Sequence, residues 1–354
     1  MIFSGWYRKK GTEMKRSNRN NISLDRIAAE CGVSPMTVSR ALRQLPSVSE
    51  KTRSRIFAAA SKLGYLPTLN AGRKAQQHEN FHSRPVQIIA RELNGSITRF
   101  HAELMLEVIR LLAAKRYECV VRVTDCSYRE FLRMLSQAGK TDAAANLLIG
   151  TFPEKELRAL LRTLPGSILL DDPGQSVPEC VYSIFSFDNV QAAILAVRHL
   201  LERKRKRILL VTGPAGHFFA REVEYGWRET LSGAGLEADP SLLIHTDFTS
   251  ADAAGKVGRA LDAGLRFDAV FTNDEMAGGV YRALLSRGFR IPEDVAVCGC
   301  DGLPVGEQLY PSLTTVILDY KTLARKVIEN IMNPDRAVSM HLRLLPVLLA
   351  RESS

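Results

Sequence analysis

The pattern of apolar and polar positions changes near residue 86 of this 354-residue chain. From there on, apolar runs of strand length alternate with amphipathic segments of helical period. The predicted strands are 86–90, 119–123, 144–150, 166–172, 182–188, 207–213, 268–274 and 295–301, and the predicted helices are about 101–115, 128–138, 154–163, 189–203, 220–234, 251–263, 275–287 and 321–333. This alternation is typical of α/β parallel sheets with helices on both faces, and about 260 residues of it favour two lobes.

The first part of the chain has the pattern of short helices instead. We expect a helix over 24–31 that stops at Gly32, where glycine accepts the left-handed conformation. A second helix, 35–43, follows the N-cap Ser34 and has Pro35 at its first position, where a missing N–H costs nothing. A third helix spans about 50–63, and the remaining predicted caps are Ser23, Ser49 and Gly64. Two short helices joined by a glycine-containing turn predict an all-α head with a helix-turn-helix.

The outward face of the second helix holds the candidate DNA contacts Pro35, Met36, Thr37, Ser39 and Arg40. In a helix-turn-helix this helix enters the major groove with its N-terminal residues first. The planar guanidinium of Arg40 suits guanine O6 and N7 or a phosphate, and the two hydroxyls suit bases or phosphates. Taken alone, the pattern also fits a small three-helix unit with a solvated charged face.

Charge distinguishes these two readings. Residues 1–80 contain fifteen Lys and Arg and five Asp and Glu, so the whole net charge of +10 lies there. The rest of the chain balances 33 basic residues against 33 acidic residues. A basic head on a neutral body is the electrostatic pattern of a nucleic-acid-binding module. We interpret 1–21 as a disordered basic arm, although Met14 could be the true start, and 68–84 as a polar linker.

Other classes of protein find little support. The six cysteines show neither disulfide nor metal spacing, and His101 and His217 lack partners at metal-ligand spacing. There is no nucleophile elbow, no Walker loop and no dinucleotide fingerprint, so we expect neither an enzyme nor a cofactor. No apolar run reaches the ~18 residues of a membrane span, and no signal peptide is evident. We therefore expect a cytoplasmic, nucleoid-associated protein without a membrane partner.

Polar residues follow several of the predicted strands, and in open α/β sheets a ligand binds at these strand ends. They are Arg91, Asp171 with Asp172, Asp188 with Asn189, Asn273 with Asp274, and Asp301. A cleft between two lobes would bring several of them around one small polar molecule. Each also has a plainer reading, because Asp and Asn at a strand-to-helix turn are common helix caps. Asp188, Asn273 and Asp274 fit that reading.

At this point the chain resembles a known family. The run NISLDRIAAECGVSPMTVSRALRQLPSVSEKTRSRIFAAASKLGYLP, over 22–67, resembles the DNA-binding head of lactose-repressor-type (LacI/GalR) regulators. The strings FSFDN (185–189), FTNDEMAGGVYRALLSRGFRIPEDVAVCGCDG (271–302) and PSLTTV (311–316) stand where that family's core has similar strings. The resemblance implies that 85–354 is a two-lobed effector-binding and dimerisation domain, like the periplasmic sugar-binding proteins.

The resemblance also implies roles for individual residues. It makes Pro35, Met36 and Arg40 base-reading positions, and Ser34, Thr37, Ser39, Ser49, Thr52 and Tyr65 backbone or support contacts. Asp171, Asn273 and Asp301 fall at effector-contacting positions, and Arg91, Phe100 and Arg221 complete the candidate effector contacts. The family pairs two heads of a homodimer on a near-palindromic double-stranded operator.

The chain departs from the family pattern at three places, and one of them is Lys204-Arg205, which replaces a Gly-His pair of the family. Lys74 stands where the hinge helix inserts a leucine wedge into the minor groove, and a lysine there could enter a narrow, negative groove instead. Val223 replaces the arginine that clamps the effector. The implied function is a DNA-binding transcriptional regulator, most simply a repressor, controlled by a sugar, sugar acid or sugar phosphate. The alternative is a cytosolic sugar-binding or sugar-modifying protein with a vestigial head.

Overall fold

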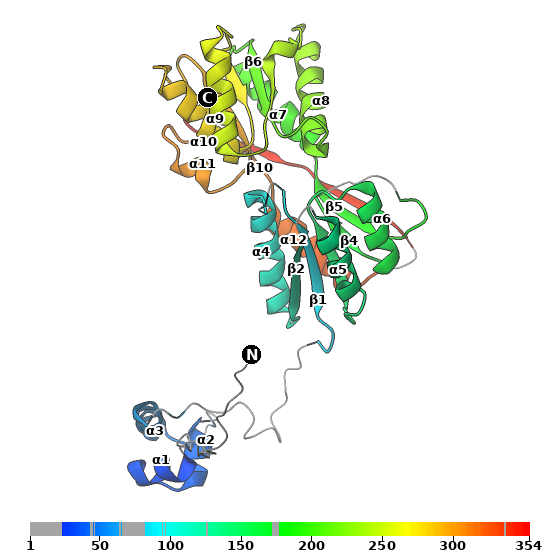
Figure 1. Cartoon of the computed structure of the whole chain (residues 1–354). Helices are drawn as coiled ribbons and strands as arrows, with labels where there is room; N and C mark the ends of the chain where they lie inside the picture. Colours follow the sequence, from blue (N-terminus) through cyan, green and yellow to red (C-terminus); the bar gives the residue numbers. More distant parts are fainter. Residues whose placement is uncertain are drawn as a thin grey trace, which may run out of the picture. The chain divides into compact units, whose positions relative to one another are not determined.

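The computed structural model describes residues 23–42, 45, 47–63, 65, 82–93, 95, 97–124, 127–171, 177–335 and 338–354. The chain separates into two compact units, Met1–Glu79 and Asn80–Ser354 (Figure 1). The predicted arm 1–21, the cap Gly64, Lys74 with most of the linker 68–84, and Asp172 lie outside the described residues. No helix in the described ranges is both long enough and apolar enough to span a membrane.

The first unit contains the three predicted helices, α1 (Leu24–Cys31), α2 (Pro35–Leu42) and α3 (Glu50–Lys62). Their shared core is built on Ile27, Val38 and Ile56, one fully buried side chain from each helix. Gly32 ends α1 with φ +57°, as predicted. Ser23 stands at the N-cap position of α1, but its side chain makes no capping hydrogen bond, so that part of the prediction is wrong.

The second unit has two lobes, and each is organised on a six-stranded sheet. In lobe 1 the strand order is β11-β5-β4-β3-β1-β2, and every pairing is parallel. Its elements are β1 (Val86–Arg91), β2 (Cys119–Thr124), β3 (Ala145–Ile149), β4 (Ile168–Leu170), β5 (Ser183–Phe187), β11 (Met340–Leu344), α4 (Arg99–Ala114), α5 (Tyr128–Ala138), α6 (Glu154–Thr163) and α12 (Tyr320–Met332). Ile88 packs under α4 and α12, whereas its neighbour Ile89 packs under α5 and α6. The sheet is therefore covered on both faces, as the alternating pattern predicts.

Lobe 2 repeats this plan with the strand order β12-β10-β9-β8-β6-β7. Its elements are α7 (Asn189–Glu202), β6 (Ile208–Thr212), α8 (Phe218–Gly233), the 3₁₀ turn η1 (Pro240–Leu242), β7 (Leu243–His245), α9 (Ser250–Asp262), β8 (Ala269–Phe271), α10 (Asp274–Leu285), β9 (Ala296–Asp301), α11 (Val305–Gln308), β10 (Thr314–Ile317) and β12 (Val347–Leu349). Only the β10–β12 pair is antiparallel among the strands described. The pairs α7–α8 and α9–α10 lie on opposite sides of the sheet (Figure 1).

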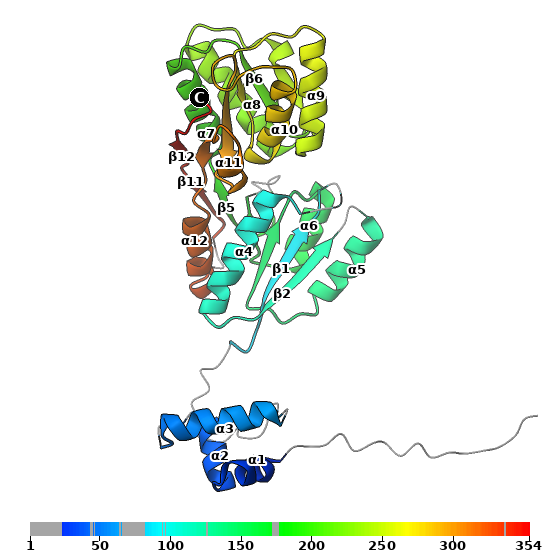
Figure 2. The ribbon, with the colours of Figure 1, turned by 90° about the vertical axis from the view of Figure 1, so that its left-hand side faces the viewer.

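The chain crosses between the lobes three times, after β5, after β10 and after β11 (Figure 2). This topology places the carboxyl ends of both sets of parallel strands toward the region between the lobes. The predicted two-lobed α/β core with a helical head is confirmed. The short edge strand β7 is an addition, because its three half-buried residues lack the long apolar run that identifies the other strands.

The contact between α9 and α10 generates a testable prediction. A Cβ at Gly279 would collide with the carbonyl oxygen of Ser250 and lie 2.9 Å from the backbone nitrogen of Ala254. Backbone atoms cannot move aside as a flexible side chain can, so Gly279→Ala is expected to lower the free energy of unfolding by roughly 1–3 kcal/mol. Denaturant unfolding measures this loss.

The adjacent glycine supplies the matched control. A Cβ at Gly278 would meet only the hydroxyl oxygen of Ser250, at 3.5 Å, which is an ordinary contact. Gly278→Ala is expected to be neutral or stabilising by up to about 1 kcal/mol, because alanine is the better helix former. Equal losses for the two variants would contradict this account of the packing.

Candidate nucleic-acid interface and ligand cleft

One face of helix α2 lies outside the core of the head and carries both polar and apolar side chains. The Ser34 hydroxyl accepts from the backbone N–H of Thr37 at 3.1 Å, so the predicted N-cap is formed. Val38 and Ala41 are buried against α1 and α3. Met36 on the opposite face is 59% exposed, and Arg40 is exposed as well. The helix therefore offers one long apolar side chain and one guanidinium to a partner.

The described basic residues of the head divide into two groups. Arg53 donates to the carbonyl oxygens of Leu45 and Val48, and Arg55 donates to that of Cys31. These arginines hold the loops and the helices together. Arg40, in contrast, pairs with none of the acidic residues described in the head. Its charge is available for a nucleic acid.

The other predicted DNA contacts are placed as follows. Ser49 caps α3, because its hydroxyl accepts from the backbone N–H of Thr52 at 3.4 Å and lies 2.9 Å from that residue's hydroxyl. Tyr65 packs partly buried against the core of the head. Ser39 is half-buried on α2. The start of α3 thus offers backbone N–H groups and hydroxyls of the kind that contact phosphates.

A cavity of about 430 Å³ lies between the two lobes. It brings together four of the six candidate effector contacts, which are Phe100, Asp171, Asn273 and Asp301. The other described residues in its wall include Ile97, Thr98, Arg99, His101, Asn189, His217, Phe218, Phe219, Asp247, Phe248, Thr249, Glu275, Leu303 and Leu318. Its volume lies within the range of small-molecule sites, roughly 300–1,000 Å³.

Two candidates stand outside this wall. The guanidinium of Arg91 forms an ion pair with Glu156 and lies 5.9 Å from the ring centre of Phe152. Arg221 donates to the carbonyl oxygen of Gly216 at 2.9 Å. Each side chain is therefore engaged within its own lobe.

The carboxylates of the cavity sit at strand ends with unusual backbone conformations. Asp171 follows β4 with φ +64°, and Asp301 ends β9 with φ +114°. Both are almost completely buried, at 5% and 4% exposed. Non-glycine residues with positive φ cost energy and persist where the surroundings fix them, often at functional sites.

Three residues, Asp188, Asn273 and Asp274, were predicted as possible helix caps, and the first two cap a helix in the structure. Asp188 accepts from the backbone N–H of Gln191 at 2.8 Å, and Asn273 accepts from that of Met276 at 2.9 Å. Asn273 also lines the cavity. Asp274 is not a cap. It is fully buried behind the cavity wall, where it accepts from the Thr315 hydroxyl at 2.6 Å and from the Leu303 N–H at 2.7 Å.

Burial governs the protonation of these acids. It raises the pKa of Asp274 to about 7, although the hydrogen bonds from Thr315 and Leu303 oppose the shift. Burial also raises the pKa of Asp301 well above its usual range, and repulsion from Asp274 and Asp171 adds to the effect.

Two histidines, His101 and His217, lie in the wall of the cavity. From the sequence we expected only that they lack partners at metal-ligand spacing. The described residues contain no group of side chains that could hold a metal ion. The backbone N–H of Phe219 donates to Nδ1 of His217, so the ring proton lies on Nε2, which donates to Thr151 of lobe 1 at 3.0 Å. Nδ1 of His101 lies 2.8 Å from the Thr98 hydroxyl, and its Nε2 has no partner among the described residues. Burial lowers the pKa of both histidines to about 4, so both are neutral at pH 7.

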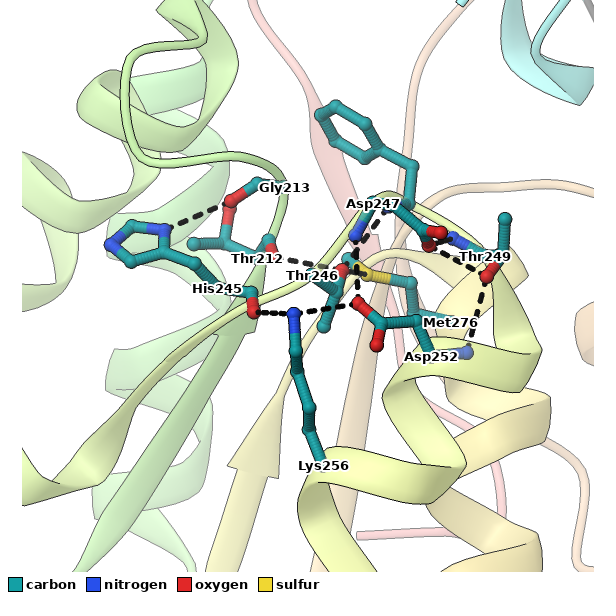
Figure 3. Close-up of polar contacts among 10 residues, drawn as sticks. Thr212, Gly213, His245, Thr246, Asp247, Thr249, Asp252, Lys256 and Met276 are labelled. Atoms are coloured by element: carbon teal, nitrogen blue, oxygen red, sulfur yellow. Dashed lines mark hydrogen bonds and ion pairs between the residues drawn. The ribbon is translucent and has the colours of Figure 1, made fainter. Parts of the chain in front are cut away.

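The loop between β7 and α9 builds the remaining wall (Figure 3). Thr246 bonds Thr212 through its backbone N–H at 2.8 Å, and Lys256 joins the His245 carbonyl oxygen, at 2.8 Å, to Asp252, at 2.7 Å. Phe248 has φ +69°, and its ring lies so close to Gly213 that a Cβ there would collide with it. The conformation of this loop depends on contacts with three other elements. For that reason no sequence motif identifies it.

Polar contacts join the lobes beside the cavity. They include the Thr151–His217 hydrogen bond and an ion pair between Arg99 of α4 and Glu275 of α10, at 3.1 Å. The Tyr320 hydroxyl of α12 also donates to the carbonyl oxygen of Asp301 at 2.9 Å. Polar contacts therefore hold the two lobes together beside the cavity.

A helix-turn-helix head followed by two lobes around such a cavity defines a ligand-responsive DNA-binding regulator. The model for "Bacterial regulatory proteins, lacI family" matches residues 23–68, and the model for "Periplasmic binding protein-like domain" matches residues 197–354. The chain belongs to the LacI family of bacterial transcriptional regulators.

Relatives match along almost the whole chain. The HTH-type transcriptional regulator CelR of Thermobifida fusca is 29% identical over 342 residues, which is 95% of this chain and 99% of that protein. The ribose operon repressor of Escherichia coli is 26% identical and covers 93% of this chain and 98% of its own length. A solved CelR–cellobiose complex superposes with a TM-score of 0.68 at 28% identity and covers 94% of this chain and all of that chain. These relatives are transcriptional regulators.

The buried histidines predict a pH dependence of stability. Because folding lowers the pKa of His101 from 6.5 to about 4, the unfolded chain takes up this proton first as the pH falls. Stability should therefore fall from pH 6.5 toward pH 4, by up to about 3 kcal/mol for one such residue. In His101→Gln, the slope of Tm against pH should be shallower in this window. The exposed His82→Gln is the control, and equal slopes in both variants would contradict the assignment.

Proposed function

We propose that the chain is an operator-binding transcriptional repressor whose affinity for DNA is set by a saccharide-type ligand bound between the lobes. The observation that supports this best is one chain with both an exposed Arg40 that pairs with none of the described acidic residues of the head and a cavity between two lobes. Two of its relatives, a ribose operon repressor and a regulator solved in complex with cellobiose, agree with it. The protein acts in the cytoplasm and catalyses no reaction.

In this proposal α2 lies in the major groove. Pro35, Met36 and Arg40 read base edges, and Ser34, Thr37 and Ser39 contact or support the backbone. Ser49 and Thr52 at the start of α3, and Tyr65 beyond its end, contact or support the DNA backbone, and Lys74 of the linker adds a minor-groove contact.

In this proposal the ligand contacts side chains from both lobes. Asp171 and Phe100 belong to lobe 1, and Asn273 and Asp301 belong to lobe 2. A molecule that touches both sets stabilises the closed arrangement by its differential affinity for that arrangement. Arg91 and Arg221 are engaged elsewhere, so we leave them out of the proposed effector contacts.

We further propose that two chains pair through lobe 1. Val121 and Val123 of the edge strand β2 are about half exposed, and so is Leu106 of the neighbouring α4. Arg122 between the two valines bonds Gln87 and Thr141. Alternation therefore directs both valines to the opposite face, and an exposed apolar edge of this kind suits an isologous contact.

The role of Arg40 is tested by DNA binding. Arg40→Ala should lose about 1–3 kcal/mol of operator affinity and relax the base preference at one position of each half-site. Lys51→Ala, at an exposed position of α3, is the control, because loss of a phosphate contact weakens all sequences alike and lowers the salt dependence. Gel shifts over a library of half-sites measure both. Uniform weakening by Arg40→Ala would contradict base reading.

The pairing surface is tested by oligomeric state. Val121→Asp with Val123→Asp should convert the dimer to a monomer at micromolar concentration, because a buried unpaired carboxylate is costly. Sedimentation velocity measures the shift. Tyr225→Asp on α8, which alters an equally exposed side chain of lobe 2, should leave the dimer intact. A double variant that remains dimeric would exclude this surface.

A further inference from the structure

A chain of hydrogen bonds begins at Asn189 in the cavity wall. Asn189 is the first residue of α7, immediately after the chain leaves lobe 1, and it is only 2% exposed. Its Nδ2 donates to Oε2 of Glu222 on α8 at 2.8 Å. Because a carboxylate can only accept, this bond fixes the carboxamide with its NH₂ group toward Glu222. The carbonyl oxygen Oδ1 has no partner among the described residues, so it is available to a ligand in the cavity.

The other carboxylate oxygen of Glu222 also has a partner. Its Oε1 accepts from Nη2 of Arg343 at 3.0 Å, and the Glu222 side chain is 19% exposed. Arg343 belongs to β11 of lobe 1, whereas Glu222 belongs to lobe 2, so this ion pair joins the two lobes. The two oxygens of one carboxylate are therefore occupied by a donor from the cavity wall and a donor from β11.

The far end of this chain of bonds lies on the strands that lead from one lobe to the other. Nε2 of His341 on β11 accepts from Nε of Arg343 at 3.4 Å and lies 3.0 Å from the hydroxyl of Ser186 on β5. Strands β5 and β11 pair in parallel, and where they leave lobe 1 the Asp188 N–H donates to the Leu344 carbonyl oxygen at 3.0 Å (Figure 2). Hydrogen bonds thus run from the cavity wall to two of the three connections between the lobes.

We propose that Glu222 is a positioning residue that couples ligand binding in the cavity to β11. Two bonds hold its flexible side chain in one conformation, and loss of either bond releases that side chain from the other partner. A ligand hydroxyl that donates to Oδ1 of Asn189 fixes the carboxamide and, through Glu222, strengthens the hold on Arg343. The role of the ligand in this inference rests on the proposed function, whereas the coupling is a property of the unliganded chain.

Two substitutions break the chain of bonds without altering Arg343. Asn189→Ala removes the donor to Oε2, and Glu222→Gln replaces one acceptor oxygen by an NH₂ group that faces a donor. In each variant, amide exchange over 340–344 should become at least about threefold faster. Asn189→Asp combined with Glu222→Gln should restore slow exchange at unchanged net charge. In that double variant the new amide donates to the new carboxylate, and its oxygen still accepts from Arg343.

Hydrogen–deuterium exchange on the full-length protein, without DNA or ligand, measures these changes. Exchange over β1, 86–91, is the internal reference that separates a local change from general unfolding. Glu224→Gln is the matched control on the same helix, because Glu224 pairs with Arg228 at 2.8 Å outside this chain of bonds, and it should leave β11 unchanged. Exchange over 340–344 that stays at the wild-type rate in both single variants overturns the proposal, as does a double variant that does not recover.

Calorimetry with ribose, glucose and cellobiose tests the role of the ligand. For a probe that binds the wild type, Asn189→Ala should weaken binding about tenfold, the loss expected for one hydrogen bond. Glu222→Gln should weaken it similarly, although Glu222 is not among the described residues of the cavity wall. Equal binding by the wild type and Glu222→Gln overturns the positioning role. If none of the three sugars binds, the proposed function loses support, and the exchange of the unliganded variants alone decides the coupling.

Discussion

The fold depends on the burial of two mainly parallel sheets on both faces. Such strands are apolar along their length, so polar side chains are accommodated mainly where the strands end. In this molecule the ends of β4, β8 and β9 supply Asp171, Asn273 and Asp301. Because the lobes direct these ends toward one another, residues far apart in the sequence meet around one cavity. The position of the cavity is thus a consequence of strand direction, and its chemistry depends on the few residues found there.

Two neighbouring acids illustrate how the surroundings decide the role of a carboxylate. Asp274 has its own donors in the Thr315 hydroxyl and the Leu303 N–H, so it joins α10 to β10 and to the segment after β9. Asp301 lies at a strained turn in the cavity wall, with the carboxylates of Asp171, Asp274 and Glu275 nearby. The first is a structural acid. The second lies in the wall of the cavity, where burial and its acidic neighbours raise its pKa well above the usual range.

Much of this architecture can be predicted from the sequence, because long apolar runs and amphipathic helices follow directly from burial on one or two faces. Capping residues also identify themselves, as Ser34, Ser49 and Gly32 do. The edge strand β7 and the loop of Phe248 escape prediction, since their conformations come from tertiary contacts. Arg91 stands at a strand end as expected, but pairing with Glu156 depends on a helix 65 residues further along the chain. His101 and His217 carry no local signal, because their environment is created by the meeting of two lobes.

The three connections between the lobes have a consequence for how a signal can vary. Bending one lobe against the other must twist all three backbone segments together, which favours rotation of rigid bodies about a common axis. None of the strand-end acids that line the cavity belongs to these connections. The stiffness of the three connections can therefore change in evolution and alter how strongly the regulator responds to its ligand. The residues that recognise the ligand need not change with it.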